Sequence, residues 1–268
     1  MNESTLNDAE LLRYSRQILL DGWDIEAQLA LKNSRILIVG AGGLGCPVSE
    51  TLARAGVGWI HLLDHDQIEE SNLQRQSLFV STDVGKYKAQ VASRQLRAIN
   101  ELITVTHVVA RLEEHNAQNI LSLPTGDFPD LILDCSDNFA TRDLLNRLSV
   151  RFGIPLLSAS AIAMTGQLAL FEPQRQTGCY HCVFGEVVDE MEKAESDAQN
   201  SQNTQNCANS GVLASTTAVI GNLQANVALQ YLGCKINPLA SQLLVWNGKT
   251  MRQRLLGYQK DSACPVCC

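Results

Sequence analysis

The sequence lacks the features that carry a chain into a membrane or out of the cell. No uninterrupted apolar stretch among the 268 residues is long enough to cross a bilayer, and no apolar run follows a basic stretch near the N-terminus. We therefore expect no membrane partner and a cytoplasmic protein. The nine cysteines then belong to a reducing compartment, where thiols more often bind metal, react or fill a core than form disulfides.

Positive charge is also scarce. Lys and Arg number 21 against 28 Asp and Glu, which gives a formal net charge of −7. Such a chain lacks the basic surface of a nucleic-acid-binding protein, so we expect no nucleic-acid partner. Phosphate ligands stay possible, because a local cluster of cations can override the overall charge. The hydrophobic share of 45% and the length are those of an ordinary folded domain with one large core.

Short apolar runs alternate with segments of helical pattern over the first 160 residues. The runs at 35–40, 59–63, 103–109, 131–135 and 155–158 predict buried strands, and the segments 46–55, 86–99, 115–123 and 140–152 predict helices. This alternation predicts an α/β fold with a doubly wound, Rossmann-like and mostly parallel sheet that has helices on both faces.

The two ends of the chain depart from this alternation. Residues 8–20 have the pattern of one amphipathic helix, and 212–232 that of a long helix. The segments 166–171, 243–246 and 251–256 predict further, antiparallel strands. Residues 186–206 are polar without apolar periodicity, which is typical of a mobile surface loop. We expect a single domain, 1–268, with an N-terminal helical segment at 1–33 and two halves at 34–160 and 161–268.

A glycine motif joins the first predicted strand to the first predicted helix. Gly40, Gly42, Gly43 and Gly45 fit G-x-G-x-x-G in the context that dinucleotide-binding turns require. Glycines let the backbone approach phosphate, and the helix N-terminus offers its N–H groups. Asp64, at the end of the next strand, is placed to accept hydrogen bonds from ribose hydroxyls. The alternative is a turn that serves only helix–strand packing.

Cations downstream of this motif favour a triphosphate over a nicotinamide. The segment Asn72-Leu-Gln74-Arg75-Gln76 follows Asp64, and Lys88 comes near the start of the next helix. Adenylation needs cations at the β- and γ-phosphates, because pyrophosphate leaves with growing negative charge. A planar guanidinium and a lysine ammonium suit that role. The alternative for each cation is a solvated surface charge.

Asp137 and Asn138 follow the buried strand at 131–135. Ligands of open α/β sheets bind at the carboxyl ends of the strands, so Asp137 is placed to hold magnesium among phosphate oxygens. Either residue could instead cap the helix that follows, and capping does not exclude metal binding.

Two C-x-x-C pairs, 81 residues apart, predict a second metal site. Cys179, Cys182, Cys264 and Cys267 supply the four thiolates of a closed tetrahedral zinc site, which is structural because no position is left for water. The alternatives are a redox-active pair, Cys268 as ligand in place of Cys267, and His181 as a ligand.

Cys207 stands apart from both pairs, just before a predicted helix. A thiol at a helix N-terminus can have a lowered pKa and react as a thiolate. The alternative is a buried small residue.

Taken in order, these motifs resemble one family over nearly the whole chain. The matching residues are Arg13-Tyr-Ser-Arg16-Gln17, the 40–45 turn, Asp64-His65-Asp66, Asn72 to Gln76, Lys88, Asp134-Cys-Ser-Asp137-Asn138 and both cysteine pairs. The combination resembles the adenylyltransferases of molybdopterin and thiamine biosynthesis (the MoeB/ThiF/HesA type), bacterial relatives of the adenylation domain of ubiquitin-activating enzymes.

The resemblance implies an activity and roles for particular residues. Gly43 and Asp64 would contact ATP, while Asn72, Arg75 and Lys88 would hold its phosphates. Arg16 would reach the nucleotide of a neighbouring subunit, which implies a homodimer. Cys207 matches a family cysteine that can engage the activated carrier.

The implied reaction is adenylation of the C-terminal glycine of a ubiquitin-like sulfur-carrier protein (MoaD- or ThiS-like), with ATP, Mg²⁺ and structural Zn²⁺. Residues 161–268 would bind the carrier, and a separate donor such as a cysteine desulfurase would supply sulfur. Other interpretations are an NAD-dependent oxidoreductase, a non-catalytic scaffold for a ubiquitin-like partner, and modification of a peptide C-terminus. The carrier and pathway are not encoded in a recognisable motif.

Overall fold

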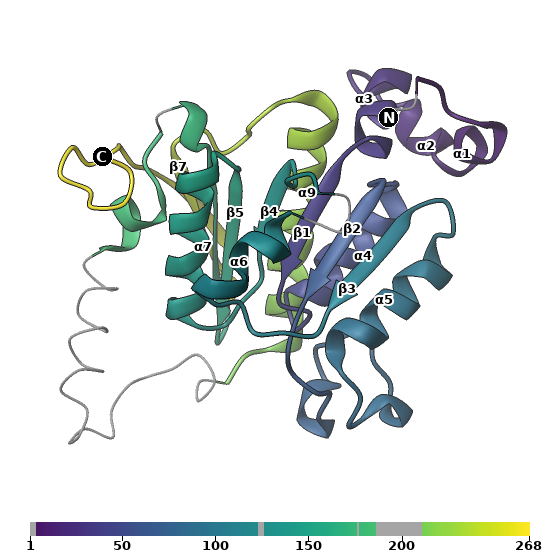
Figure 1. The fold of residues 1–268 in the computed structure, drawn as a ribbon, viewed down its shortest axis with the longest axis horizontal. Helices are drawn as coiled ribbons and strands as arrows, with labels where there is room; N and C mark the ends of the chain where they lie inside the picture. Colours follow the sequence, from purple (N-terminus) through teal and green to yellow (C-terminus); the bar gives the residue numbers. More distant parts are fainter. Residues whose placement is uncertain (1–3, 123–125, 176, 186–210) are drawn as a thin grey trace.

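The computed structural model describes residues 4–122, 126–175, 177–185 and 211–268 (Figure 1). The predicted loop at 186–206 and Cys207 lie outside these residues. Among the described residues, none of the helices has the length and hydropathy of a membrane span.

Eight strands of the described chain form one sheet in the order β3-β2-β1-β4-β5-β6-β7-β8. Strands β1 (Arg35–Val39), β2 (Trp59–Leu63), β3 (Thr104–Val108), β4 (Leu131–Asp134) and β5 (Leu156–Ile162) pair in parallel. Strands β6 (Thr165–Phe171), β7 (Gln242–Asn247) and β8 (Arg252–Gly257) extend the sheet antiparallel. The predicted mostly parallel sheet with antiparallel C-terminal strands is confirmed.

Helices cover both faces of the sheet (Figure 1). They are α1 (Asp8–Arg13), α2 (Ser15–Ile18), α3 (Asp24–Lys32), α4 (Gly45–Ala55), α5 (Lys88–Ile99), α6 (Glu114–Leu121), α7 (Phe139–Phe152) and α9 (Ala214–Cys234), and residues 180–185 are also helical. Short 3-10 helices occupy η1 (Glu70–Asn72), η2 (Ser81–Asp83) and η3 (Pro173–Arg175).

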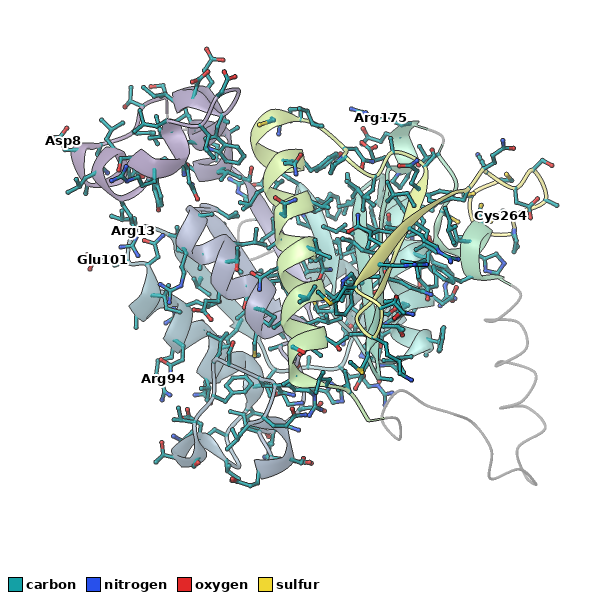
Figure 2. The ribbon with its side chains drawn as sticks, turned by 180° about the vertical axis from the view of Figure 1, so that it is seen from behind. Asp8, Arg13, Arg94, Glu101, Arg175 and Cys264 are labelled. Atoms are coloured by element: carbon teal, nitrogen blue, oxygen red, sulfur yellow. The ribbon has the colours of Figure 1, made fainter. Side chains whose placement is uncertain are left out.

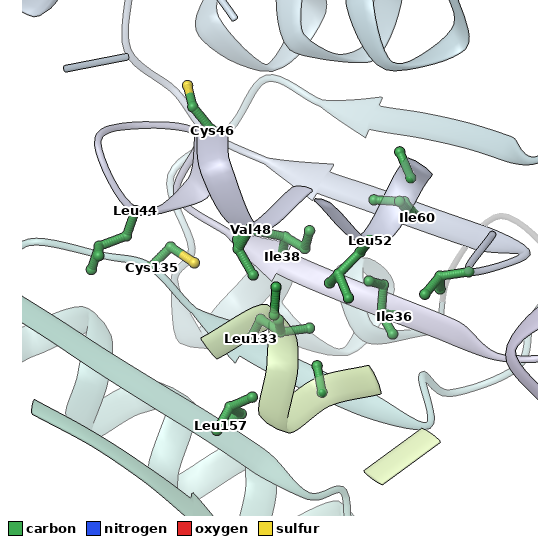
Figure 3. Close-up of a cluster of buried hydrophobic side chains, with 14 of the residues drawn as sticks. Ile36, Ile38, Leu44, Cys46, Val48, Leu52, Ile60, Leu133, Cys135 and Leu157 are labelled. Atoms are coloured by element: carbon green, nitrogen blue, oxygen red, sulfur yellow. The ribbon is translucent and has the colours of Figure 1, made fainter. Parts of the chain in front are cut away.

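The core lies in two layers because successive side chains of a strand point to opposite faces. In β1, Ile36 and Ile38 pack with α4, α5 and α9, whereas Leu37 and Val39 pack with α6 and α7. Figure 3 shows the first of these layers, where side chains from β1, α4, β2, β4 and β5 meet. Burial on both faces explains why the parallel strands are continuous apolar runs in the sequence.

The predicted single helix at 8–20 is wrong in one respect. It is broken at Tyr14, between α1 and α2. Tyr14 is buried, and its hydroxyl accepts a hydrogen bond of 2.9 Å from Nδ2 of Asn100. This tertiary contact anchors the residue where the helix stops, and a local apolar pattern carries no information about it.

The N-terminal helices lie at the amino ends of the strands. The amide Nε2 of Gln28 donates to the carbonyl of Ala55, and the amide of Gly58 donates to Leu31, directly before β2 begins. Figure 1 shows α1, α2 and α3 together at this end, and Figure 2 shows Arg13 there from behind, on the opposite side of α9 from Cys264. The carboxyl ends of β1, β2 and β4 therefore form the other end of the sheet.

Candidate active site

The glycine turn needs its glycines partly for packing. Gly40 has a φ of +96°, and a Cβ there would lie 2.7 Å from the carbonyl oxygen of Cys135. A Cβ on Gly45 would lie 2.0 Å from the carbonyl oxygen of Gly40. Both positions exclude any side chain, so packing alone already requires glycine there, and their predicted contact with a nucleotide stays a prediction.

Gly42 and Gly43 differ, because protein backbone does not crowd them. A Cβ on Gly42 would meet only Nε2 of Gln76 at 3.6 Å, and one on Gly43 would meet side-chain atoms of Thr217 and Arg75 at 3.1 and 3.4 Å. The space at Gly42 leaves room for a ligand to approach the backbone, whereas the side chains of Thr217 and Arg75 closely border Gly43.

Asp64 holds the turn from the end of β2. It is 8% exposed; its Oδ2 accepts from the amide of Ala41 at 2.7 Å and its Oδ1 from the amide of Asp66 at 2.8 Å. Burial raises the pKa of the Asp64 carboxyl, and the Ala41 hydrogen bond and the charge of Lys88 act against this rise. A carboxylate has about four lone-pair positions, so two remain for ribose hydroxyls.

Lys88 reaches the same place from the start of α5. Its side chain is 9% exposed, and its Nζ lies 2.8 Å from Oδ2 of Asp66. Partial burial acts to raise the pKa of Asp66, but the hydrogen bond and charge of Lys88 outweigh it and lower that pKa. The Lys88 ammonium lies beside the glycine turn. Its partner Asp66 is half-exposed and can be solvated by water, so the ammonium can exchange this contact for a phosphate.

Arg75 and Gln76 line the turn from the segment after η1. Nη1 of Arg75 donates to the carbonyl of Ser71 at 3.1 Å, which orients the guanidinium. Gln76 is 2% exposed, and its Oε1 is buried with no hydrogen-bond partner among the described residues. A buried acceptor without a partner is costly, so this amide fits a site whose partner is a bound ligand.

Asn72 and Gln74 take different positions in this segment. Asn72 is buried, and its Oδ1 accepts from the amide of Glu69 at 3.1 Å, which closes η1. Gln74 is exposed. Asn72 therefore shapes the segment that carries Arg75, and its predicted phosphate contact stays a prediction, as does that of Gln74.

The loop after β4 carries Asp137 to the glycine turn. The ideal Cβ of Gly40 would lie 3.2 Å from the amide of Ser136, the residue before Asp137. The side chain of Asn138 caps α7, because its Oδ1 accepts from the amide of Thr141 at 2.9 Å. Asp137 is exposed and does not cap the helix. The capping alternative thus applies to Asn138, and the carboxylate of Asp137 can serve a cation.

Arg16 is not brought into this group. It is exposed on α2, at the amino ends of the strands, whereas the glycine turn lies at the carboxyl ends (Figure 1). The site of the same chain is therefore out of its reach.

The four predicted zinc ligands come together. The Sγ of Cys179 lies 3.9 Å from the Sγ of Cys182 and 3.7 Å from that of Cys264. The Sγ atoms of Cys182 and Cys267 are 3.5 Å apart. A tetrahedral Zn²⁺ with bonds of about 2.3 Å separates its sulfurs by roughly 3.8 Å, so the cluster fits zinc. Cys268 points elsewhere, with its Sγ on the carbonyl of Asp261 at 3.1 Å.

Three further residues near the turn were given no separate role from the sequence. Thr217, at the start of α9, packs on Gly43. Asp134 is fully buried and accepts from the amide and hydroxyl of Ser136 and from the hydroxyl of Ser158. Arg142, on α7, is 6% exposed. Asp134 belongs to the motif noted above, whereas a buried arginine cannot be told from a surface one by sequence pattern.

The chain is similar to known proteins over its full length. It is 39% identical over 265 residues to the molybdopterin-synthase adenylyltransferase of Salmonella typhimurium, which covers 98% of each chain. It is 37% identical over 262 residues to the sulfur carrier protein ThiS adenylyltransferase of Escherichia coli, covering 98% of this chain and 97% of the relative. These relatives give no support to the oxidoreductase alternative.

Solved structures agree with the fold. The structure of Escherichia coli MccB with ATP superposes with a TM-score of 0.77 at 29% identity, covering 100% of this chain and 75% of the other. Residues 14–266 match the family described as ThiF. The chain therefore belongs to the ThiF family, and it is an adenylyltransferase of that family.

Proposed function

We propose that this protein transfers AMP from ATP to the C-terminal glycine carboxylate of a small ubiquitin-like sulfur-carrier protein, with release of pyrophosphate. The observation that supports the proposal most is the convergence of Arg75, the Asp66–Lys88 pair and the Asp137 loop on one glycine turn. The named relatives act on ThiS or molybdopterin synthase, which fits a carrier substrate.

For this reaction the protein must position the two reactants and offset the negative charge of the phosphates. The carrier carboxylate is ionised at neutral pH, so it attacks the α-phosphate without a general base. As the bond to the β-phosphate breaks, negative charge grows on pyrophosphate, and Arg75 and Lys88 offset it. Gly42 and Gly43 let the backbone N–H groups approach the phosphates, and Asp64 accepts from the ribose. Mg²⁺, when bound, would neutralise phosphate charge at Asp137.

We also propose a homodimer in which Arg16 of one subunit serves the site of the other. Its position at the amino ends of the strands supports this, since it cannot reach its own glycine turn. Large apolar side chains are exposed near it on α1 and in the turn after α2, with Leu12 at 79% and Leu19 at 77%. Such a surface suits contact with a second copy.

The domain is proposed to divide its work as the sequence predicts. Residues 34–160 supply the glycine turn, Lys88 and Asp137, so they would form the nucleotide half. Residues 161–268 supply the antiparallel strands and all four cysteines of the cluster, and would bind the carrier. Zn²⁺ at this cluster would fasten the C-terminal tail to the helix at 180–185.

Sulfur is proposed to come from a separate donor such as a cysteine desulfurase. The two described thiols at the glycine turn, Cys46 and Cys135, are buried. Burial raises the pKa of Cys46 to about 12 and that of Cys135 well above its usual value, so neither suits nucleophilic sulfur transfer. We also propose that Cys207, which lies outside the described residues, engages the activated carrier.

Mixing the protein with ATP, Mg²⁺ and each candidate carrier, followed by intact-mass measurement, tests the proposal. One carrier is expected to gain an AMP group, and a carrier without its terminal glycine to gain none. A short peptide that gains AMP while every carrier stays unmodified would replace the carrier with a peptide substrate.

A further inference from the structure

A buried arginine holds the loop that carries Asp137. Nη2 of Arg142 donates to the carbonyl of Ser136 at 2.7 Å and to that of Ala159 at 3.2 Å. The first carbonyl lies just beyond β4 and the second belongs to β5. One guanidinium therefore fixes the residue that precedes Asp137 to the neighbouring strand.

Asp134 holds the same residue from the other side. Its Oδ1 accepts from the amide of Ser136 at 3.0 Å and from the Ser136 hydroxyl at 2.6 Å, and its Oδ2 lies 3.9 Å from Nε of Arg142. Ser158 donates to Oδ2 at 2.6 Å. Amide, hydroxyl and carbonyl of Ser136 are all engaged by two opposite buried charges, so the backbone before Asp137 has little freedom.

Arg142 also connects to the cysteine cluster. It hydrogen-bonds the Tyr180 phenol, whose pKa burial raises and the charge of Arg142 lowers. The amide of Tyr180 donates to Oδ1 of Asn146 at 3.0 Å, and Nδ2 of Asn146 donates to Sγ of Cys179 at 3.5 Å. Arg142 and Asn146 lie one turn apart on α7. Buried polar contacts thus run without a break from Cys179 to the Asp137 loop.

We propose that Arg142 is a positioning residue that sets the Asp137 carboxylate for Mg²⁺, with the cysteine cluster as its fixed support. This rests on the proposed function, since it concerns the magnesium of the same site. The planar guanidinium can reach two carbonyls and a carboxylate together. A lysine ammonium cannot place its N–H donors in the same planar arrangement. The chain of contacts gives α7 a fixed register against the loop.

Arg142→Lys, which keeps the charge, tests the proposal by calorimetric titration of ATP with and without Mg²⁺. We expect ATP affinity in Mg²⁺ to fall roughly 10- to 100-fold, as for other residues that support a metal ligand, while affinity without Mg²⁺ stays within about twofold. Zinc content is expected to match the unsubstituted protein, because all four thiols remain. The matched control is Arg151→Lys, at an exposed position of the same helix, which should change neither affinity.

A double-mutant cycle with Asp137→Asn separates positioning from a general structural effect. If Arg142 acts through Asp137, adding Arg142→Lys to Asp137→Asn costs no further affinity in Mg²⁺. Additive losses, or an equal loss with and without Mg²⁺, would overturn the proposal. Ser158→Ala removes one hydrogen bond to Asp134 and keeps both charges, so it replaces Arg142→Lys if that variant does not fold.

Substitution of Asp137 alone distinguishes the magnesium site from the role of Arg142. An Asp137→Asn protein with normal Mg²⁺ dependence would contradict the proposed magnesium site itself. An Asp137→Asn protein that loses this dependence, beside an Arg142→Lys protein that keeps it, would overturn only the role of Arg142.

Discussion

The side chain of Arg75 packs on the backbone of Gly43, with its Cδ 3.4 Å from the position that a Cβ of Gly43 would occupy. Arg75 comes from the segment after η1, and Gly43 comes from the turn between β1 and α4. This contact places a cation beside the glycine turn. We expect a phosphate bound at the turn to lie near this guanidinium.

Substitution of the glycines is expected to separate packing from ligand binding. Gly45→Ala places a Cβ 2.0 Å from a backbone oxygen, so the free energy of unfolding should fall by roughly 1–3 kcal/mol or more. Gly42→Ala meets ordinary contact distance and should cost under about 1 kcal/mol, yet it should weaken ATP binding because the Cβ would fill space proposed for the nucleotide. Urea unfolding and ATP titration of both variants measure this, and normal ATP affinity in Gly42→Ala would contradict it.

The tail cysteines should differ in metal binding. Cys267→Ser removes a ligand of the cluster, so we expect loss of zinc and a fall in the free energy of unfolding of roughly 3 kcal/mol or more. Cys268→Ser is the control, because its Sγ contacts a carbonyl of Asp261 and not the cluster. Zinc content by elemental analysis and thermal unfolding measure both. Retention of zinc by Cys267→Ser together with its loss from Cys268→Ser would reverse the ligand assignment.

Mixing two inactive variants tests the exchange of Arg16 between subunits. Arg16→Ala and Lys88→Met should each be inactive alone, because every site lacks one cation. In mixed dimers one site receives both, so random exchange should restore up to about a quarter of the activity. Adenylation assays after subunit exchange measure this recovery. Activity that never rises above the two separate variants, despite proven exchange, would place Arg16 outside the partner's site.

His61 makes stability depend on pH. It is buried in β2, its Nδ1 lies 2.7 Å from Oγ1 of Thr106, and burial lowers its pKa from 6.5 to about 4, with His107 adding to the effect. The unfolded chain therefore binds a proton that the folded chain does not between pH 6.5 and 4. Stability must fall as pH falls through this window, by about 2 kcal/mol between pH 7 and pH 5.

Urea unfolding at the two pH values checks this dependence. His61→Gln should lose less stability than the unsubstituted protein on going from pH 7 to pH 5. His115→Gln, at an exposed position of α6, should leave the dependence unchanged. An unchanged pH dependence in His61→Gln would show that other groups cause the effect.

The sequence predicted the sheet because local pattern and burial agree there. Strands buried on both faces are short apolar runs, and the turn at 40–45 needs glycine for steric reasons visible at Gly40 and Gly45. The break at Tyr14 was not predicted, because the residue that holds its hydroxyl, Asn100, is distant in sequence. By residue type, either Asp137 or Asn138 could cap α7, and in the structure Asn138 is the cap.

The buried polar residues that hold the site could not be predicted from the sequence for a related reason. Arg142 and Asn146 have the same helical spacing as surface residues, and they are buried by tertiary contacts with the β4–β5 region and with Cys179 and Tyr180. Thr217 becomes part of the turn because α9 folds back across β5 and β6. Residues that bind through chemistry can be predicted from type and spacing, whereas residues that hold them depend on which helix covers which strand.

The most direct test of the central claim is ATP–pyrophosphate exchange with a purified carrier, compared between the unsubstituted protein and Lys88→Met. The side chains have similar length, and the partner Asp66 is half-exposed, so the variant should stay folded with a loss of under about 1 kcal/mol. We predict carrier-dependent exchange in the unsubstituted protein and a loss of at least about 100-fold in Lys88→Met. Exchange at the normal rate in folded Lys88→Met would contradict the account.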